Sequence, residues 1–234
     1  MKKSFQFKQF HIQQAPNVLP VGTDGILLGS WTSVPTTGRV LDVGTGTGLL
    51  CLMMAQRTPR SRITGIDISP DAISCANNNI AASPFQTHIQ LIETDLKNFE
   101  APPFDLIVVN PPFFDTGTRN SNPQLAKARH TDALTLPTLI TSISHLLTAE
   151  GKSSLILPSE KLALALSLAR EQALFPTRIT HVSATQQKPP HRVLLQLEQT
   201  PSPVEEKHLI IQKGGANQYT DEYIRLTRDF YLFM

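Results

Sequence analysis

The sequence predicts a doubly wound α/β protein with a mostly parallel sheet and an antiparallel pair of strands near the C-terminal end. Short apolar runs alternate with helical patterns from residue 39 to residue 173, and the first run ends in a glycine-rich turn. The run at 104–109 is almost wholly apolar, as expected for a strand that helices cover on both faces. Alternation of this kind favours parallel βαβ units over an all-β or all-α architecture.

The first elements follow this alternation closely. Residues 39–43 form a buried-strand pattern, residues 49–57 a helical one, and residues 62–68 the next strand. A Ser-Pro-Asp sequence at 69–71 then starts a helix that ends near residue 82. It supplies a capping hydroxyl, a proline at the first helical position and an acid in the first turn.

The later elements complete the predicted sheet. They are strands at 88–94, 104–110 and 153–157, helices at 136–147 and 160–173, an antiparallel strand pair at 178–182 and 192–197, a further short strand at 208–212 and a terminal helix at 219–233. The antiparallel pair is expected at the edge of the sheet, because two prolines separate its strands.

The overall composition excludes several classes of protein. With 21 basic and 19 acidic residues the formal charge is +2, which excludes an acidic disordered chain and a strongly basic coat protein. The two cysteines have no metal-ligand spacing and form no disulfide framework, which indicates a reducing compartment. No apolar run approaches the roughly 18 residues of a membrane span. We therefore expect a soluble cytoplasmic protein without a metal site.

The charge is unevenly distributed. Residues 21–115 contain nine acids and five bases, whereas the rest of the chain contains sixteen bases and ten acids. The first part suits a partly cationic ligand, and the remainder tolerates an anionic partner.

The glycine-rich turn at 42–48 (D-V-G-T-G-T-G) follows the first strand directly. Its G-x-G-x-G spacing differs from the G-x-G-x-x-G of dinucleotide-binding proteins. Gly44 and Gly46 allow a ligand to approach the backbone closely. Asp42 would repel a pyrophosphate but attract the ammonium group of an amino acid. The alternative is an ordinary strand–helix turn.

Acids end three successive predicted strands. Asp42 could attract an ammonium group, Asp67 could accept hydrogen bonds from ribose hydroxyls, and Asp95 could accept from an adenine amino group. A ligand with all three features is S-adenosylmethionine, which we expect as the cofactor. The alternative is that these acids are solvated loop ends.

The most specific feature is the sequence N-P-P-F that follows the fourth strand. Pro111 and Pro112 give the chain a rigid exit from the strand, which aims the Asn110 side chain and the Pro111 carbonyl into the crevice. These two acceptors can hold both hydrogens of a planar amino group and so free its lone pair for attack on a methyl sulfonium. Phe113 would stack on the target base. The alternative is a structural turn.

These motifs resemble those of class I methyltransferases that act on exocyclic or amide nitrogens, with a Rossmann-like sheet. Within that class the chain resembles the bacterial tRNA(Val) adenine N6-methyltransferase family. Further segments carry the likeness: 21–31 (V-G-T-D-G-I-L-L-G-S-W), 128–130 (A-R-H), 192–195 (R-V-L-L), Tyr223 and 226–232 (L-T-R-D-F-Y-L).

The resemblance implies methylation of the adenine beside the anticodon of valine tRNA. It implies cofactor contacts for Asp42, Gly44, Asp67 and Asp95 and target contacts for residues 110–113. It also implies that Thr23 and Asp24 close over the cofactor, although the short helix after Gly22 could equally be a packing element. The partner is then the anticodon loop of a tRNA, with no membrane. The oligomeric state is left open, with a monomer as the simplest expectation.

Two related activities and one non-enzymatic role remain as alternatives. Release-factor glutamine methyltransferases usually have Tyr at the aromatic position, and ribosomal guanine N2-methyltransferases have His where this chain has Phe114. Phe113 and Phe114 argue mildly against both. The third alternative is an RNA-binding module that retains the cofactor fold without catalysis.

We expect a single methyltransferase domain over residues 1–234. It would comprise an extension with the cofactor-closing helix at 1–37, a catalytic core at 38–200 and a C-terminal extension at 201–234. Two basic segments could meet RNA, and each has a plainer alternative. One, at 2–10, interleaves lysine with phenylalanine and could be a packed strand. The other, at 119–130, could be a solvated loop.

Overall fold

The computed structural model describes residues 4–111, 134–215 and 218–233. Its main sheet has the strand order β10-β8-β9-β7-β6-β3-β4-β5. These strands are β3 (Arg39–Val43), β4 (Arg62–Asp67), β5 (Ile89–Glu93), β6 (Phe104–Val109), β7 (Leu147–Pro158), β8 (Phe175–Thr185), β9 (Arg192–Glu198) and β10 (Glu205–Gln212). Within this sheet only β9 runs against its neighbours, which confirms the mostly parallel arrangement.

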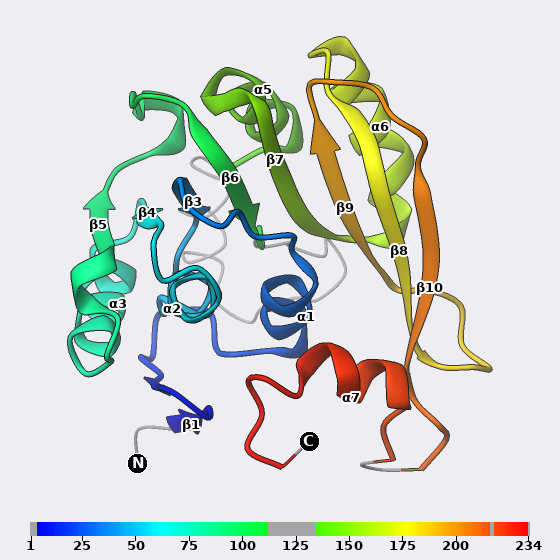
Figure 1. The fold of residues 1–234 in the computed structure, drawn as a ribbon, viewed down its shortest axis with the longest axis horizontal. Coiled ribbons are helices and arrows are strands. Elements are labelled where there is room, and N and C mark those ends of the chain that lie inside the picture. Colours follow the sequence, from blue (N-terminus) through cyan, green and yellow to red (C-terminus); the bar gives the residue numbers. More distant parts are fainter. Residues whose placement is uncertain (1–3, 112–133, 216–217, 234) are drawn as a thin grey trace, which may run out of the picture.

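Helices cover both faces of the sheet (Figure 1). They are α1 (Thr23–Trp31), α2 (Leu49–Arg57), α3 (Pro70–Ala81), α5 (Leu136–Leu146), α6 (Leu162–Glu171) and α7 (Asp221–Thr227), with 3₁₀ turns η1 (Gln86–His88), η2 (Leu96–Asn98) and η3 (Ser159–Lys161). Residues of α1, α2, α3 and α7 share one hydrophobic core, and residues of α5 and α6 share the other. The described helices therefore cover the sheet on both faces.

The apolar strands fit this double cover. Along β3 and β6, Val40 and Leu106 belong to the first core, whereas Leu41 and Ile107 belong to the second. Successive residues of each strand therefore face two apolar cores, which explains why both strands are mostly apolar. Within the described residues, no helix is both long and apolar enough to cross a membrane.

The predicted start of α3 is confirmed at atomic detail. The Ser69 hydroxyl accepts a hydrogen bond from the Ala72 backbone N–H at 3.3 Å, and Pro70 occupies the first helical position. The cap fixes where the helix begins, immediately after the end of β4.

The C-terminal part differs from the prediction in two ways. β10 pairs in parallel with β8 and forms the sheet edge, so the antiparallel pair of β8 and β9 lies one strand further in. The predicted helix at 219–233 is wrong in length, because α7 ends at Thr227. Beyond it the chain turns so that Phe230 is buried in the core.

A small hairpin of β1 (Ser4–Gln6) and β2 (His11–Gln13) packs against this C-terminal turn. Phe7 and Phe10 are buried there, with their rings 4.7 Å apart. The Lys8 side chain donates to the Arg228 carbonyl. Packing therefore accounts for residues 4–10 of this segment, and these two rings are not available to stack on a base. Lys2 and Lys3, and the basic segment at 119–130, lie outside the described residues.

Candidate active site

The register of the sheet brings three predicted site segments to one edge. Val43 of β3 pairs with Ile66 of β4 and with Val109 of β6. The next residues along the three strands, Gly44, Asp67 and Asn110, therefore leave the sheet side by side, with about 5 Å between neighbouring strands. This is the carboxyl edge, where open α/β sheets bind their ligands.

The glycine-rich turn presents open backbone at this edge. Gly44 and Gly46 have φ angles of +71° and +55°, a region that favours glycine. A Cβ built at Gly44 would meet no atom within 4 Å, so the space above it is open. The N–H groups of Gly44 and Thr45 both donate to the Ile66 carbonyl at 2.9 Å, which pins the turn to β4.

Asp67 is oriented by two backbone donors. Its Oδ2 accepts from the Gly46 N–H and its Oδ1 from the Ser69 N–H, each at 2.9 Å. Each oxygen keeps a further lone pair, so the carboxylate is a fixed acceptor that can still bind hydroxyl groups. The next residue, Ile68, is 52% exposed and offers an apolar surface beside it. The sequence did not single out Ile68, since an apolar residue after a strand carries no distinctive signal.

Asp42 lies beneath the turn and is fully buried. Its Oδ2 accepts from the Thr45 hydroxyl at 2.7 Å and from the Cys51 thiol at 3.3 Å, while its Oδ1 has no partner. Burial raises the pKa of Asp42 to about 6, against the lowering effect of the bonds from Thr45 and Cys51. The orphaned oxygen is an acceptor without a donor, as expected of a site that a cationic ligand completes.

Asp95 has a local structural role in addition to its predicted contact with the cofactor. It is half-buried, and its Oδ1 accepts from the Lys97 N–H at 3.0 Å, which caps η2. The preceding residue, Thr94, donates its backbone N–H to the Asp67 carbonyl at 2.9 Å. Asp95 therefore lies next to Asp67 along the same edge, and its contact with an adenine amino group stays a prediction.

Asn110 is half-buried directly after β6, and Pro111 is buried behind it. Pro112 and Phe113 lie outside the described residues. The amide of Asn110 adjoins the first turn of α1, because a Cβ built at Gly25 would lie 3.7 Å from its Nδ2 and 2.9 Å from a methyl of Leu49. Gly25 therefore leaves room for the Leu49 side chain and lies within contact distance of Asn110. It was not singled out from the sequence, although it lies within the segment 21–31 that resembles the family.

Helix α1 is largely a packing element. Residues 25–31 are all buried, and Trp31 donates its ring N–H to the Thr180 hydroxyl of β8 at 3.0 Å. Thr23 is exposed at the start of the helix, and Asp24 is half-buried there. Of the helix, only this first turn can reach a ligand, so the contribution of Thr23 and Asp24 to cofactor binding stays a prediction.

Asp24 is engaged by a partner that sequence analysis did not assign to it. Its Oδ2 accepts from Nε of Arg192, the first residue of β9, at 2.8 Å. Both side chains are about one-third exposed. No local pattern could connect them, because α1 and β9 meet only after the whole sheet has formed.

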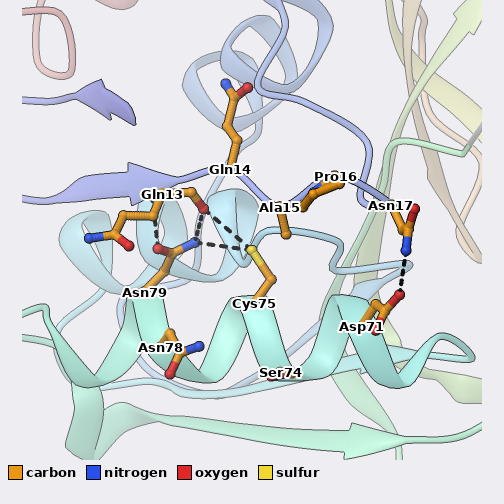
Figure 2. Close-up of a pocket in the computed structure, with 10 residues that line it drawn as sticks. All are labelled: Gln13, Gln14, Ala15, Pro16, Asn17, Asp71, Ser74, Cys75, Asn78 and Asn79. Atoms are coloured by element: carbon orange, nitrogen blue, oxygen red, sulfur yellow. Dashed lines mark hydrogen bonds between the residues drawn. The ribbon is translucent and has the colours of Figure 1, made fainter. Parts of the chain in front are cut away.

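A buried amide joins the N-terminal segment to the glycine-rich turn. Asn79 of α3 accepts from the Gln13 N–H at 2.9 Å and donates to the Gln13 carbonyl at 3.1 Å and the Thr47 carbonyl at 2.9 Å. Figure 2 shows this contact beside a cavity of about 260 Å³ between residues 13–17 and α3. A single asparagine in a polar helix gave no signal of this role.

The structure describes no metal centre. Over residues 4–111, 134–215 and 218–233, no three His, Cys, Asp or Glu side chains group as metal ligands would. Cys51 and Cys75 are both buried and form no disulfide.

Comparison with known proteins agrees with this geometry. The methyltransferase small domain family matches residues 21–170. Among solved structures, a predicted O-methyltransferase from Agrobacterium tumefaciens superposes with a TM-score of 0.69 at 19% identity, over 88% of this chain and 96% of its own. A 16S rRNA N2 G1207 methyltransferase from T. thermophilus, in complex with AdoMet and guanosine, superposes at 0.60 and 18% identity, over 86% and 50%. Fold and site thus define a class I methyltransferase that uses S-adenosylmethionine.

Closer relatives identify the family within this class. The tRNA1(Val) (adenine(37)-N6)-methyltransferase of Vibrio parahaemolyticus is 42% identical over 233 residues, which cover 99% of this chain and 97% of the relative. The protein of the same name from Parabacteroides distasonis is also 42% identical over 233 residues, with 98% of each chain covered. The chain belongs to the tRNA1(Val) (adenine(37)-N6)-methyltransferase family.

Proposed function

We propose that this protein transfers the methyl group of S-adenosylmethionine to the exocyclic N6 of adenine 37, next to the anticodon of valine tRNA. The observation that carries the proposal is Asn110, which leaves β6 in register with the glycine-rich turn in a chain 42% identical, end to end, to enzymes named for that reaction. The same sequence identity favours methylation of adenine N6 over methylation of a protein glutamine or of guanine N2. Because the substrate is tRNA, the protein would act in the cytoplasm.

The described residues fit the cofactor. Open space lies above Gly44, the Asp67 carboxylate is held with acceptor capacity to spare, and the buried Asp42 has an oxygen without a donor. Asp67 would bind the ribose hydroxyls and Asp95 the adenine amino group. Asp42 would attract the ammonium group, with Gly44 and Gly46 in close backbone contact and Thr23 and Asp24 closing over it. When bound, S-adenosylmethionine supplies an electrophilic methyl group on a sulfonium.

The chain's own residues would prepare the target nitrogen. The Asn110 amide oxygen and the Pro111 carbonyl would accept the two N6 hydrogens, which favours a pyramidal nitrogen with an available lone pair. Phe113 would stack on the adenine, and Pro112 would keep the segment rigid. A strong general base is not required, because the N6 proton becomes acidic once the nitrogen carries the methyl group. Extrusion of a base costs least in a loop, which suits an anticodon loop as substrate.

The test is a labelling assay with radioactive S-adenosylmethionine. Valine tRNA should become labelled, whereas the same transcript with guanine in place of adenine 37 should not, and a release factor should not. Asn110→Ala should abolish turnover while cofactor affinity is kept, and Asp67→Ala should weaken cofactor binding. If only the release factor becomes labelled, the substrate is a protein and not tRNA. Full activity of Asn110→Ala would exclude this mechanism.

A further inference from the structure

The loop between β8 and β9 lies at the same sheet edge as Asn110. β8 runs parallel to β7 and ends at this edge, and β9 begins there. Pro158 of β7 pairs with Arg192 of β9, while Leu155 pairs with Val109 of β6. Because neighbouring strands lie about 4.8 Å apart, the start of β9 lies two strands, or about 10 Å, across the sheet from β6. β8 is a third strand away and continues five residues past Thr180, which is level with Asn110, so the loop itself begins roughly 20 Å from Asn110.

This loop presents polar and basic groups to solvent. Gln186, Gln187, Lys188 and His191 are all exposed. The sequence contains no acid from residue 172 to residue 197. An anionic ligand at this position would therefore meet donors and positive charge without repulsion from the loop itself.

The loop is also held in place. The Lys188 N–H donates to the Thr185 carbonyl at 3.2 Å, and the His191 N–H donates to the Val182 carbonyl at 3.0 Å. Two consecutive prolines, at 189–190, restrict the backbone between them. A fixed loop loses less conformational entropy when it binds, which favours a role in recognition.

The start of η3 adds a second cation to the same place. The Ser159 N–H donates to the His191 carbonyl at 3.3 Å, and Lys161 is exposed two residues further on. Glu160 is exposed beside it and offsets part of the charge. Arg192 contributes less, because its guanidinium is bound to Asp24.

The cavity beside α3 differs in chemistry. Its lining contains Gln13, Gln14, Asn17 and Asn78 but no lysine or arginine, and it includes Asp71 (Figure 2). A phosphate would be repelled there. The β8–β9 loop is therefore the better match for a nucleic-acid backbone than this cavity.

We propose that the β8–β9 loop, together with Lys161, binds the sugar-phosphate backbone of the tRNA whose adenine enters the crevice at Asn110. The inference rests on the proposed function and adds a surface to it. Lys161 and Lys188 bind phosphates, and the amides of Gln186 and Gln187 bind ribose or base edges. An adenine drawn into the crevice leaves the rest of the anticodon loop outside, where phosphates several nucleotides away can meet a cationic surface roughly 20 Å from Asn110.

The experiment compares a double variant, Lys161→Gln with Lys188→Gln, with the unchanged protein. Affinity for valine tRNA is measured by fluorescence anisotropy across salt concentrations. Each lost contact to a single-stranded phosphate lowers the slope of log K against log salt by about 0.7, so the double variant should lose about 1.4. The KM for tRNA should rise, while cofactor affinity and melting temperature stay unchanged.

A matched control removes the same charge elsewhere. Arg60 and Arg62 are exposed at the start of β4, on the opposite edge of the sheet. The double variant Arg60→Gln with Arg62→Gln should leave the slope of log K against log salt unchanged. An unchanged slope in the lysine variant, or an equal fall in the arginine control, would overturn the inference even though the unchanged protein methylates tRNA. If the unchanged protein labels no tRNA at all, the proposed function fails instead.

Discussion

Asp24 and Arg192 lie 2.8 Å apart, Oδ2 to Nε, although 168 residues separate them in the chain. The pair joins the first turn of α1 to the start of β9. The residue after Asp24 is Gly25, which adjoins the amide of Asn110. The ion pair therefore holds the helix turn that forms one wall around Asn110, so its loss should disturb the reaction by moving this turn, in addition to the cofactor contact proposed for Asp24.

Loss of this pair should lower turnover more than stability. An ion pair that is about one-third exposed contributes up to about 1 kcal/mol to folding, whereas a shift of about 1 Å near reacting groups can cost about 100-fold in rate. We expect Asp24→Asn and Arg192→Gln each to reduce kcat by about 10- to 100-fold. The double variant should be no worse than Asp24→Asn alone. A thermodynamic cycle on kcat tests this, and additive losses would show that the two side chains act separately.

Gly25→Ala should impair methyl transfer through crowding. The added methyl would lie 2.9 Å from a methyl of Leu49, so the Leu49 side chain must move, and it would be in ordinary contact with the Asn110 amide at 3.7 Å. We expect at least a tenfold fall in kcat, on the scale of other small displacements near reacting groups.

Gly22→Ala is the matched control for Gly25→Ala. Gly22 precedes α1 with a φ of −131°, and a Cβ there would meet only the Pro20 carbonyl at 4.0 Å. Equal loss of kcat in both variants would show that crowding at Gly25 is not the cause.

Local patterns predicted the parts of the site that follow one another in the chain. The strand at 39–43, its glycine-rich turn and the capped helix after Ser69 all occur as expected. Parallel pairing then brings Asp67 and Asn110 to the same edge. The parts that sequence could not predict depend on distant packing: the partner of Asp24, the parallel pairing of β10, and the early end of α7 at Thr227.

Asn79→Ala should both destabilise the fold and weaken cofactor binding. It removes three hydrogen bonds that tie Gln13 and Thr47 to α3. The Gln13 carbonyl still accepts from the Cys75 thiol, but the Gln13 N–H and the Thr47 carbonyl lose these bonds, and a backbone group left without a partner costs about 1–3 kcal/mol. We expect the free energy of unfolding to fall by about 3 kcal/mol in urea titrations, with weaker cofactor affinity by calorimetry. Asn78→Ala, at an exposed neighbouring position, should change neither quantity.

Asp42 should make stability depend on pH. Its pKa is about 6 in the fold, against 3.8 for an aspartate in the unfolded chain, so the fold disfavours the ionised carboxylate. Below about pH 4 the group is protonated in both states and costs nothing. Stability is lost as pH rises from about 4 to 6, and the loss reaches about 3 kcal/mol above that range.

The variant Asp42→Asn isolates this effect. It cannot ionise, so its stability relative to the unchanged protein should rise between pH 4 and pH 6 and then level off. Urea unfolding at several pH values measures the difference, and a difference that does not vary with pH would contradict the prediction. The same variant should bind the cofactor more weakly, because it lacks the negative charge.

The aromatic contact between the N-terminal hairpin and the C-terminal turn constrains the order in which the chain can fold during synthesis. Phe7 is buried partly by Tyr231, and the Lys8 N–H donates to the Phe230 carbonyl. A ribosome adds roughly 5–20 residues per second, so roughly 10–45 s pass between synthesis of the hairpin and synthesis of Phe230 and Tyr231. During that time its phenylalanines are exposed to solvent or to chaperones, and this part of the core closes only when the last turn of the chain has emerged.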